Sequence, residues 1–277
     1  MPIGNQVHRR RTQVELLRFG PRIAAAPVAM DALTTAAASG MRARMESLDM
    51  LANNLANASA TGFKADREFY STYASADALA AQNASGTPAV ESPVVDRSWT
   101  DFSQGVIVPT GNPLDLALDG PGFFVAQSSS GAKYTRSGDF HIDPRGVLST
   151  REGDPVEGAD GQPIGLDPAQ PVEVSDTGEI HQNGVVAGQL KLVEFTAPQA
   201  LGKRGDNSFQ LAVSDLQPVP AAARVRQGNT EAANVQPAET AVRLVSVMRQ
   251  FEMLQKAMSL GNEMNQQAIQ NVARAGG

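Results

Sequence analysis

The sequence contains no cysteine, few aromatic residues and no long hydrophobic run. The absence of cysteine excludes disulfides, thiolate catalysis and thiolate metal sites together. No stretch approaches the ~20 apolar residues that cross a membrane as a helix, so we expect no membrane span. The only histidines, His8, His141 and His181, are far apart and lack the spacing of metal ligands. No metal site is predicted.

Excess positive charge is also missing, because the formal net charge of the 277 residues is −6. A protein that binds nucleic acid needs a basic face to contact phosphates, so nucleic acid is not an expected partner. A hydrophobic content of 42% is enough for a core. The length suits two modest domains, or one domain with long extensions.

The C-terminal segment, 229–277, predicts one long helix that begins at Pro237. Proline is favoured in the first turn because its missing N–H has no helical partner there. A helix from 237 to 274 would be roughly 57 Å long. Its narrow apolar stripe, with polar flanks, predicts a coiled-coil contact with a partner outside its own domain. The stripe has three- and four-residue spacing and consists of Leu244, Val247, Phe251, Leu254 and Met258, continued by Gly261, Asn265, Ala268 and Val272.

A second helix is expected near the N-terminus, from Asp31, a suitable N-cap, to about residue 58. Its apolar stripe reads Thr34, Ala38, Met41, Met45, Leu48, Ala52 and Leu55. The two helices can pair with each other or with copies in neighbouring subunits; the alternative is an ordinary helical hairpin that closes one domain. Three amides at the helix end form either a solvated terminus or a polar interface that bridges subunits: Asn53, Asn54 and Asn57.

The chain before the first helix differs from the rest. Residues 1–29 contain five arginines against one glutamate, and their short apolar run is broken by Pro27. This is a poor match to a signal peptide. We expect either a disordered leader or a reading frame that truly starts at Met30.

Between the helices the pattern changes to short strands. Residues 30–70 hold the first helix, and residues 71–104 form an extended connection of low order because they are rich in alanine, serine and threonine. Residues 105–228 predict a compact antiparallel all-β domain with turn signals at Asp143–Gly146 and Asn183–Gly184. The expected fold class is α+β, with long terminal helices flanking this domain.

No catalytic constellation is found. Asp115 and Asp119 lie four residues apart on a strand whose acids are expected to face solvent, whereas a general acid needs burial and a raised pKa. Arg136 and Asp139 are expected to form a local ion pair. No G-x-S-x-G motif and no phosphate-binding glycine loop occur. We therefore predict no enzyme activity and no cofactor.

Four blocks of sequence, in order, resemble the axial proteins of the bacterial flagellar rod and hook. They are LDMLANNLANASATGFKADREFY (48–70), FSQGVIVPTGNPLDLALDGPGFFVAQ (102–127), YTRSGDFHIDPRGVLST (134–150) and GNTEAANVQPAETAVRLVSVMRQFEMLQKAMSLGNEM (228–264). Together they span most of residues 30–277. Residues 1–29 lie outside the resemblance.

The resemblance implies a structural subunit of the basal-body rod, more similar to the proximal-rod type than to the distal-rod type. Such a subunit polymerises helically through its terminal helices, forming part of the drive shaft and export channel. Its implied partners are copies of itself, other rod proteins and the flagellar export apparatus, and its implied location is the periplasmic rod, reached without a cleaved signal peptide. The expected assembly residues are Met41, Met45, Leu48, Ala52, Asn53, Asn54, Leu55, Asn57, Leu244, Val247, Phe251, Leu254 and Met258.

Two other functions remain as alternatives. One is a cell-wall hydrolase on the β domain, which would require a cleft with paired, perturbed acids. The other is a secreted adhesin with coiled-coil ends, against which the four ordered blocks count.

Overall fold

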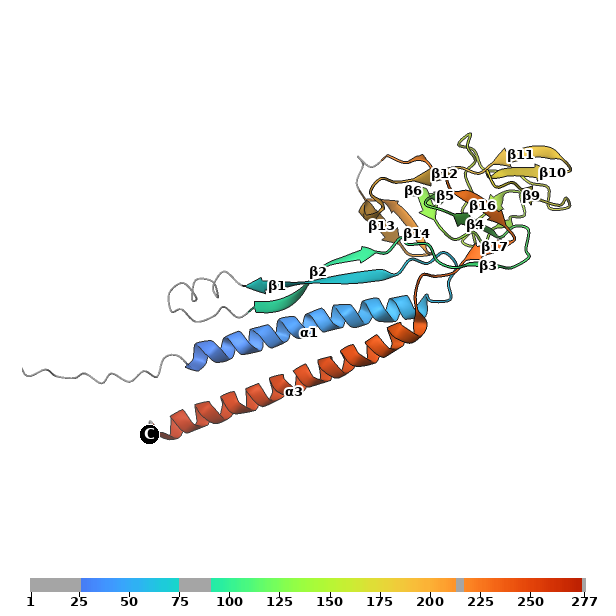
Figure 1. Ribbon diagram of the computed structural model, residues 1–277. Coiled ribbons are helices and arrows are strands. Elements are labelled where there is room, and N and C mark those ends of the chain that lie inside the picture. Colours follow the sequence, from blue (N-terminus) through green and yellow to red (C-terminus); the bar gives the residue numbers. More distant parts are fainter. Residues whose placement is uncertain (1–25, 75–90, 213–216, 276–277) are drawn as a thin grey trace, which may run out of the picture.

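The computed structural model describes residues 26–74, 91–212 and 217–275. A long stalk extends from one side of a β-rich region, and both terminal helices belong to the stalk (Figure 1). The first helix is α1, Ala26–Ala56, and the last is α3, Pro237–Ala275. The predicted arrangement, an antiparallel β-rich centre between two terminal helices, is confirmed. Most of the predicted leader, residues 1–25, lies outside the described residues.

Helix α3 begins at the predicted residue, Pro237, and runs along α1 (Figure 1). The side chains that the sequence placed on its apolar stripe are less exposed than their neighbours. Val247 is buried, and Leu244, Phe251, Leu254 and Met258 are half-buried. A Cβ placed on Gly40 of α1 would lie 3.7 Å from Leu254 Cδ1, so this stripe faces α1 within the same chain. We call these five residues the inner stripe.

Helix α1 corrects two predictions. It begins at Ala26 rather than at Asp31. Alanine favours helix, and Pro27 falls in the first turn where its missing N–H costs nothing. Its buried positions, Gly40, Ala43, Ser47, Leu51 and Asn54, lie beside the predicted apolar stripe rather than on it.

The stripe predicted for α1 is the more exposed face. Met45, 52% exposed, and Ala52 are open to solvent, while Met41, Leu48 and Leu55 are half-buried. The small residues on the covered face let α1 fit between α3 and the strands on its other side (Figure 1). Hydrophobicity alone selected the uncovered face of α1, because the contacts inside the chain use small residues.

A long antiparallel hairpin forms the third element of the stalk. Strand β1, Asp66–Ala74, pairs with β2, Glu91–Thr100, with a bulge between Phe69 and Tyr70. The expectation of a low-order connection over 71–104 is therefore wrong for its described parts. Aromatic and β-branched residues in both segments favour strand. Local composition does not reveal that two segments separated by residues 75–90 pair with each other.

The β-rich region is built around a six-stranded antiparallel sheet with the order β13-β14-β6-β5-β12-β15. Its strands are β5 Phe123–Ser128, β6 Gly131–Thr135, β12 Leu192–Glu194, β13 Leu201–Arg204, β14 Ser208–Leu211 and β15 Val219–Pro220. A 3-10 turn, η1 Pro198–Ala200, precedes β13.

Smaller antiparallel sheets complete the region. One has the order β11-β10-β9, and the other three are the pairs β16-β4, β17-β3 and β7-β8. Because β17 pairs with β3, the β unit extends beyond the predicted boundary at residue 228. The strands are β3 Ile107–Pro109, β4 Leu116–Asp119, β7 His141–Ile142, β8 Leu148–Ser149, β9 Glu173–Val174, β10 Glu179–Gln182, β11 Val185–Gln189, β16 Arg224–Gln227 and β17 Asn229–Glu231.

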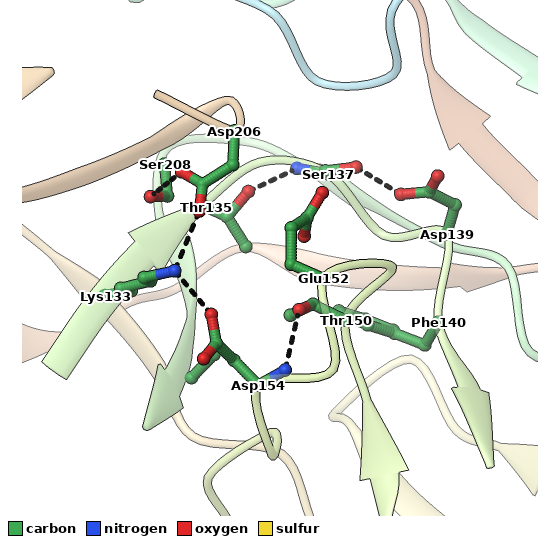
Figure 2. A pocket seen from close by; sticks show the side chains of 11 residues that line it. Lys133, Thr135, Ser137, Asp139, Phe140, Thr150, Glu152, Asp154, Asp206 and Ser208 are labelled. Atoms are coloured by element: carbon green, nitrogen blue, oxygen red, sulfur yellow. Dashed lines mark hydrogen bonds and ion pairs between the residues drawn. The ribbon is translucent and has the colours of Figure 1, made fainter. Parts of the chain in front are cut away.

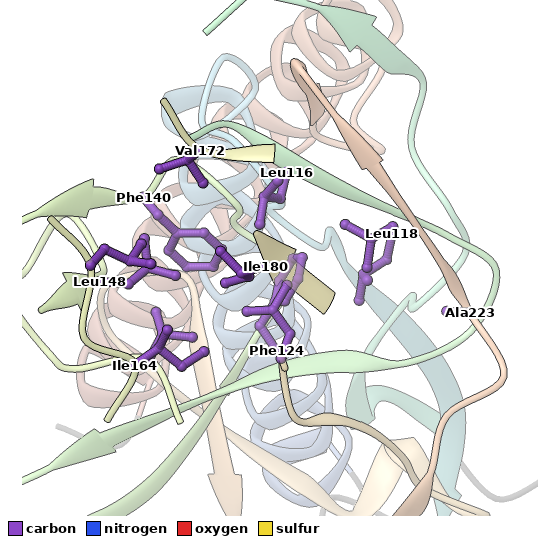
Figure 3. Close-up of a cluster of buried hydrophobic side chains, with 13 residues drawn as sticks. Leu116, Leu118, Phe124, Phe140, Leu148, Ile164, Val172, Ile180 and Ala223 are labelled. Carbon is purple, nitrogen blue, oxygen red and sulfur yellow. The ribbon is translucent and has the colours of Figure 1, made fainter. Parts of the chain in front are cut away.

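Two apolar clusters form the core. The larger one centres on Phe124, which meets Phe140 edge to face at 5.1 Å between ring centroids (Figure 3). The second lies around Phe123 and Phe209. Consecutive Phe123 and Phe124 thus serve opposite faces of β5, which explains an apolar run without alternation.

Both predicted turn signals are confirmed. Asn183 and Gly184 have φ values of 51° and 77° and link β10 to β11. At the other turn the N–H of Gly146 donates to the carbonyl of Asp143 over 2.9 Å. Asp143 also accepts from the N–H groups of Arg145 and Val147, which holds its pKa below the ordinary value although burial opposes the shift.

Candidate assembly surfaces and the stalk junction

Three buried charges hold the stalk to the β-rich region. Lys64 follows α1, Arg136 follows β6, and Glu231 ends β17. Lys64 Nζ lies 2.5 Å from Glu231 Oε1, and Arg136 Nε lies 2.9 Å from Glu231 Oε2. The side chains of Lys64 and Glu231 are fully buried, and that of Arg136 is 4% exposed. We call these three residues the junction cluster.

Backbone groups of Gly62, Ser103 and Gly105 complete the cluster. Lys64 Nζ donates to the carbonyl of Ser103 over 2.8 Å, and the N–H of Gly105 donates to Glu231 Oε1 over 2.8 Å. The N–H of Gly62 donates to the carbonyl of Glu231 over 2.7 Å. The cluster therefore joins the chain after α1, the chain after β2 and the chain before α3.

Arg136 corrects a prediction, because it does not pair with Asp139. Its Nη1 donates to the carbonyls of Gly120 and Gly122, each over 2.8 Å, and its Nε faces Glu231. Asp139 instead pairs with Arg151 and accepts from the hydroxyl of Ser137. Neighbours in sequence point to different faces here, so proximity along the chain was misleading.

The charge balance of the junction cluster is one carboxylate between two cations. Burial lowers the pKa of Lys64 below its ordinary value, and the attraction of Glu231 opposes this shift. Burial likewise lowers the pKa of Arg136. A buried charge is costly unless it is paired and hydrogen-bonded, so Glu231 is the group on which both cations depend.

Two asparagine side chains support the junction. Asn54 accepts from the N–H of Asp66 over 2.9 Å and donates to the carbonyl of Asp66 over 2.7 Å. Asn234 accepts from the N–H of Ala65 over 2.8 Å and donates to the carbonyl of Asp101 over 2.7 Å. The amide of Asn54 is therefore hydrogen-bonded inside the chain, to the first residue of β1.

Sequence reasoning missed the junction cluster, although its residues lie within the resembling blocks. Lys64 belongs to GFKADREFY, and Glu231 belongs to GNTEAANVQP. They are 167 residues apart in sequence, and no local pattern pairs charges at that distance.

The polar pocket in Figure 2 offers no room for a substrate. Lys133 Nζ lies 2.5 Å from Asp154 Oδ2 and 2.7 Å from Asp206 Oδ2, and the cavity beside them measures about 10 Å³. Such a volume holds about one water molecule. Desolvation opposes the ionised lysine, but the two carboxylates outweigh it and raise the pKa of Lys133. The pocket is a closed ion-pair network.

Other residues considered for chemistry lie on the surface or in pairs. Asp119 pairs with Arg226 over 2.6 Å, and Asp115 accepts from the amide of Asn112 over 2.8 Å. Among the described residues, no group of three or more His, Asp or Glu side chains is placed to hold a metal ion. Within the same residues no helix has the length and apolar character needed to cross a membrane.

The face of α3 that points away from α1 carries large exposed apolar side chains. They recur at intervals of eleven, seven and four residues, which keeps them on one side of a helix. We call them the outer stripe: Val242 (73% exposed), Met253 (62%), Leu260 (57%) and Met264 (61%). The sequence analysis did not single out this stripe.

The predicted assembly residues thus fall into three groups. Leu244, Val247, Phe251, Leu254 and Met258 face α1, and Asn54 faces β1. On α1, Met45, Ala52 and Asn53 are exposed, and Met41, Leu48 and Leu55 are half-buried; Asn57, which follows α1, is also half-buried. A role between subunits stays a prediction for each of them.

Comparison with known proteins places this architecture in a family. Three family models match in order: "Flagella basal body rod protein" over residues 35–64, "Flagellar hook protein FlgE/F/G D1 domain" over 117–187 and "Flagellar basal body rod FlgEFG protein C-terminal" over 226–271. The first and third contain Lys64 and Glu231.

Curated relatives agree over nearly their whole length. The flagellar basal-body rod protein FlgF of Caulobacter vibrioides is 33% identical over 228 residues, which cover 82% of this chain and 92% of that protein. The flagellar basal-body rod protein FlgG of Borreliella burgdorferi is 31% identical, with 85% of this chain and 96% of that protein covered. The chain therefore belongs to the flagellar basal-body rod protein family and is a structural subunit of the flagellum.

Proposed function

We propose that this rod subunit polymerises through its stalk, with the outer stripe of α3 packing against the stalk of a neighbouring copy. The observation that carries the proposal is the row of four large apolar side chains, each more than half exposed in the single chain. Soluble helices rarely leave such a row uncovered. Because the inner stripe faces α1, the outer stripe is the surface available to a neighbour.

The energetics favour this contact. Fully burying one Leu or Met side chain contributes ~1.5–3 kcal/mol, and the outer stripe offers three such residues and a valine. Contacts between different patches that do not close into a ring generate a helical filament. The half-buried Met41, Leu48 and Leu55 on α1 are the proposed receiving surface.

The wider role follows from the family. We propose that the assembled stalks form part of the drive shaft and of the export channel within it, with other rod proteins and the export apparatus as further partners. The subunit reaches the periplasmic rod without a cleaved signal peptide. The proximal-rod type remains our proposal for its place along the rod. In this role the protein is structural and catalyses no reaction.

Replacing an outer-stripe residue by an acid tests the proposal. Leu260→Glu should remove the chain from purified basal bodies and abolish swimming, since burying a lone carboxylate costs several kcal/mol. The matched control is Gln255→Glu, an exposed position off the outer stripe. Because Leu260 is exposed in the single chain, unfolding of the purified Leu260→Glu protein should change by less than ~0.5 kcal/mol. Normal incorporation of Leu260→Glu would refute the proposed contact.

A further inference from the structure

We propose that the exposed edge of β11 pairs with the exposed edge of β13 in the next copy, which adds a second contact between subunits in the β-rich region. The inference rests on the proposed polymerisation of copies, but uses a surface separate from the stalk. Strand addition at a free sheet edge is a recurring mode of protein recognition.

The first observation is that β11 is an edge strand, hydrogen-bonded to β10 alone in the described sheet. Its two-residue turn closes on the pair Gln182 and Val185, so the backbone groups of the next residue, Val186, point away from β10. Val185 is 69% exposed and Val186 is 56% exposed. Backbone groups and valine side chains are thus available together.

The second observation is that this edge lacks lysine and proline, although a bulge interrupts its pairing with β10 between Ile180 and His181. Natural proteins guard free edges with lysine, proline or a covering segment. Strand β11 reads VVAGQ, without proline or charge, and only its last residue is covered, by a hydrogen bond from the N–H of Ala159 to the carbonyl of Gln189. An uncharged edge of this kind, which begins with two exposed valines, fits a strand partner.

Charge specifies the kind of strand. The segment 152–190, which includes β9, β10 and β11, contains eight acidic residues and no lysine or arginine: Glu152, Asp154, Glu157, Asp160, Asp167, Glu173, Asp176 and Glu179. Some are paired internally, such as Glu157 with Lys191. Glu179, on β10 beside Gln189 of β11, is 48% exposed. The partner strand should therefore be basic.

Three edge strands of the described residues, β13, β15 and β3, can be compared as partners, and β13 fits best. Strand β13 is an edge of the six-stranded sheet and carries Lys203 and Arg204. Lys203 is ion-paired with Asp66 over 2.8 Å within the chain, so Arg204 is the basic group left for a partner. The opposite edge, β15, has only two residues and includes Pro220, which lacks an N–H. Strand β3 has no charged residue. Of these edges, β13 alone offers complementary charge.

The positions of the two edges suit a growing assembly. In Figure 1, β11 and β13 lie on opposite sides of the β-rich region. Joining unlike edges of successive copies leaves one free edge at each end, so the contact can repeat. Four or five paired residues are too few to hold two proteins together alone. Paired stalks would supply the high local concentration that a short strand contact needs.

Cysteine cross-linking in basal bodies tests the inference, since the chain has no cysteine of its own. Val186→Cys with Gly202→Cys, treated with a short bifunctional maleimide, should give dimers and higher multimers of the chain. A Cβ on Gly202 meets only ordinary contacts, the nearest at 3.6 Å, so this change is tolerated. The controls combine Val186→Cys with Val219→Cys on β15 or with Val108→Cys on β3, and neither should cross-link.

Charge reversal provides a second readout. Arg204→Glu should lower the yield of cross-linked multimers about twofold, the low end of the range for cross-strand charge pairs, because β11 lies between Glu179 and the partner strand. Adding Glu179→Arg should restore the yield. Cross-links to β15 or β3, or none at all in basal bodies that contain the double-cysteine chain at its normal level, would overturn the strand pairing and leave the stalk contact standing. Absence of Leu260→Glu from basal bodies tests the stalk contact separately.

Discussion

Replacing Glu231 by glutamine should destabilise the protein strongly, although the two side chains have nearly the same shape. The carboxylate lies between Lys64 and Arg136, and both its own side chain and that of Lys64 are fully buried. Glutamine keeps the shape and can still accept from the N–H of Gly105. It removes the negative charge, so two buried cations face each other unpaired.

The expected cost is ~3–5 kcal/mol, the range found when one partner of a buried ion pair is removed. Domains are stable by only ~5–15 kcal/mol, so this change removes a large fraction of the total. An exposed pair provides the matched control. Asp119→Asn breaks the pair with Arg226, whose side chain is 56% exposed, and should cost at most ~1 kcal/mol.

Urea unfolding of the full chain can measure both changes. The only tryptophan, Trp99, lies on β2 two residues before Asp101, whose carbonyl contacts Asn234, so its fluorescence reports on the junction. The double variant Lys64→Met/Glu231→Gln should lose at least ~1 kcal/mol less free energy of unfolding than the sum of the two single changes, because it no longer contains the unpaired charge of Lys64. A cost for Glu231→Gln no greater than that of Asp119→Asn, or strict additivity in the double variant, would refute the account.

Three further predictions concern single positions. Gly138→Ala would place Cβ 1.6 Å from a backbone oxygen and should destabilise the protein by ~1–3 kcal/mol or more, whereas Gly165→Ala meets no atom within 4 Å and should change little in thermal melts. Burial raises the pKa of Asp206, but hydrogen bonds from its lysine and serine partners outweigh it and leave the pKa below the ordinary 3.8. Its contribution is therefore present above pH 3.8 and is lost as the pH falls through the folded-state pKa. Asp206→Asn should thus be less stable than the parent at pH 7, and the difference should shrink as the pH falls below 3.8; a constant difference would contradict the assignment. Asn54→Ala leaves the N–H and the carbonyl of Asp66 on β1 without their side-chain partner and should lower the free energy of unfolding by ~1–3 kcal/mol in urea melts. Replacement of the exposed Asn53 by alanine should lower it by less than ~0.5 kcal/mol. Equal losses would show that the two hydrogen bonds of the Asn54 amide do not stabilise the fold.

The sequence predicted those features that depend on local pattern. Pro237 began the last helix as expected, the inner stripe was found from its spacing, and Asn183–Gly184 marked its hairpin. Features that depend on packing between distant segments were not predictable in the same way. The covered face of α1 is selected for small residues, which hydrophobicity does not detect.

The candidate surfaces were also predictable only where they depend on local pattern. The junction cluster joins residues that are far apart in the sequence, and Arg136, the one member considered beforehand, was expected to pair with Asp139 nearby. The outer stripe escaped notice because its four members are separated by longer, less regular intervals than the inner stripe. The β1–β2 hairpin required pairing across an intervening segment, and composition alone described it as a connection.

The long sequence separation between paired residues of the stalk also affects the order in which the protein folds. Lys64 can form its ion pair only with Glu231, which lies 167 residues later in the sequence. Glu68 likewise pairs with Arg243, which lies 175 residues later. Contacts between such distant residues carry the full loop-closure entropy and form slowly. Most of the β-rich region lies between them and can form its local hairpins first. The stalk contains the first described residues of the chain. When the N-terminus emerges first, the stalk is nevertheless the last part to be completed.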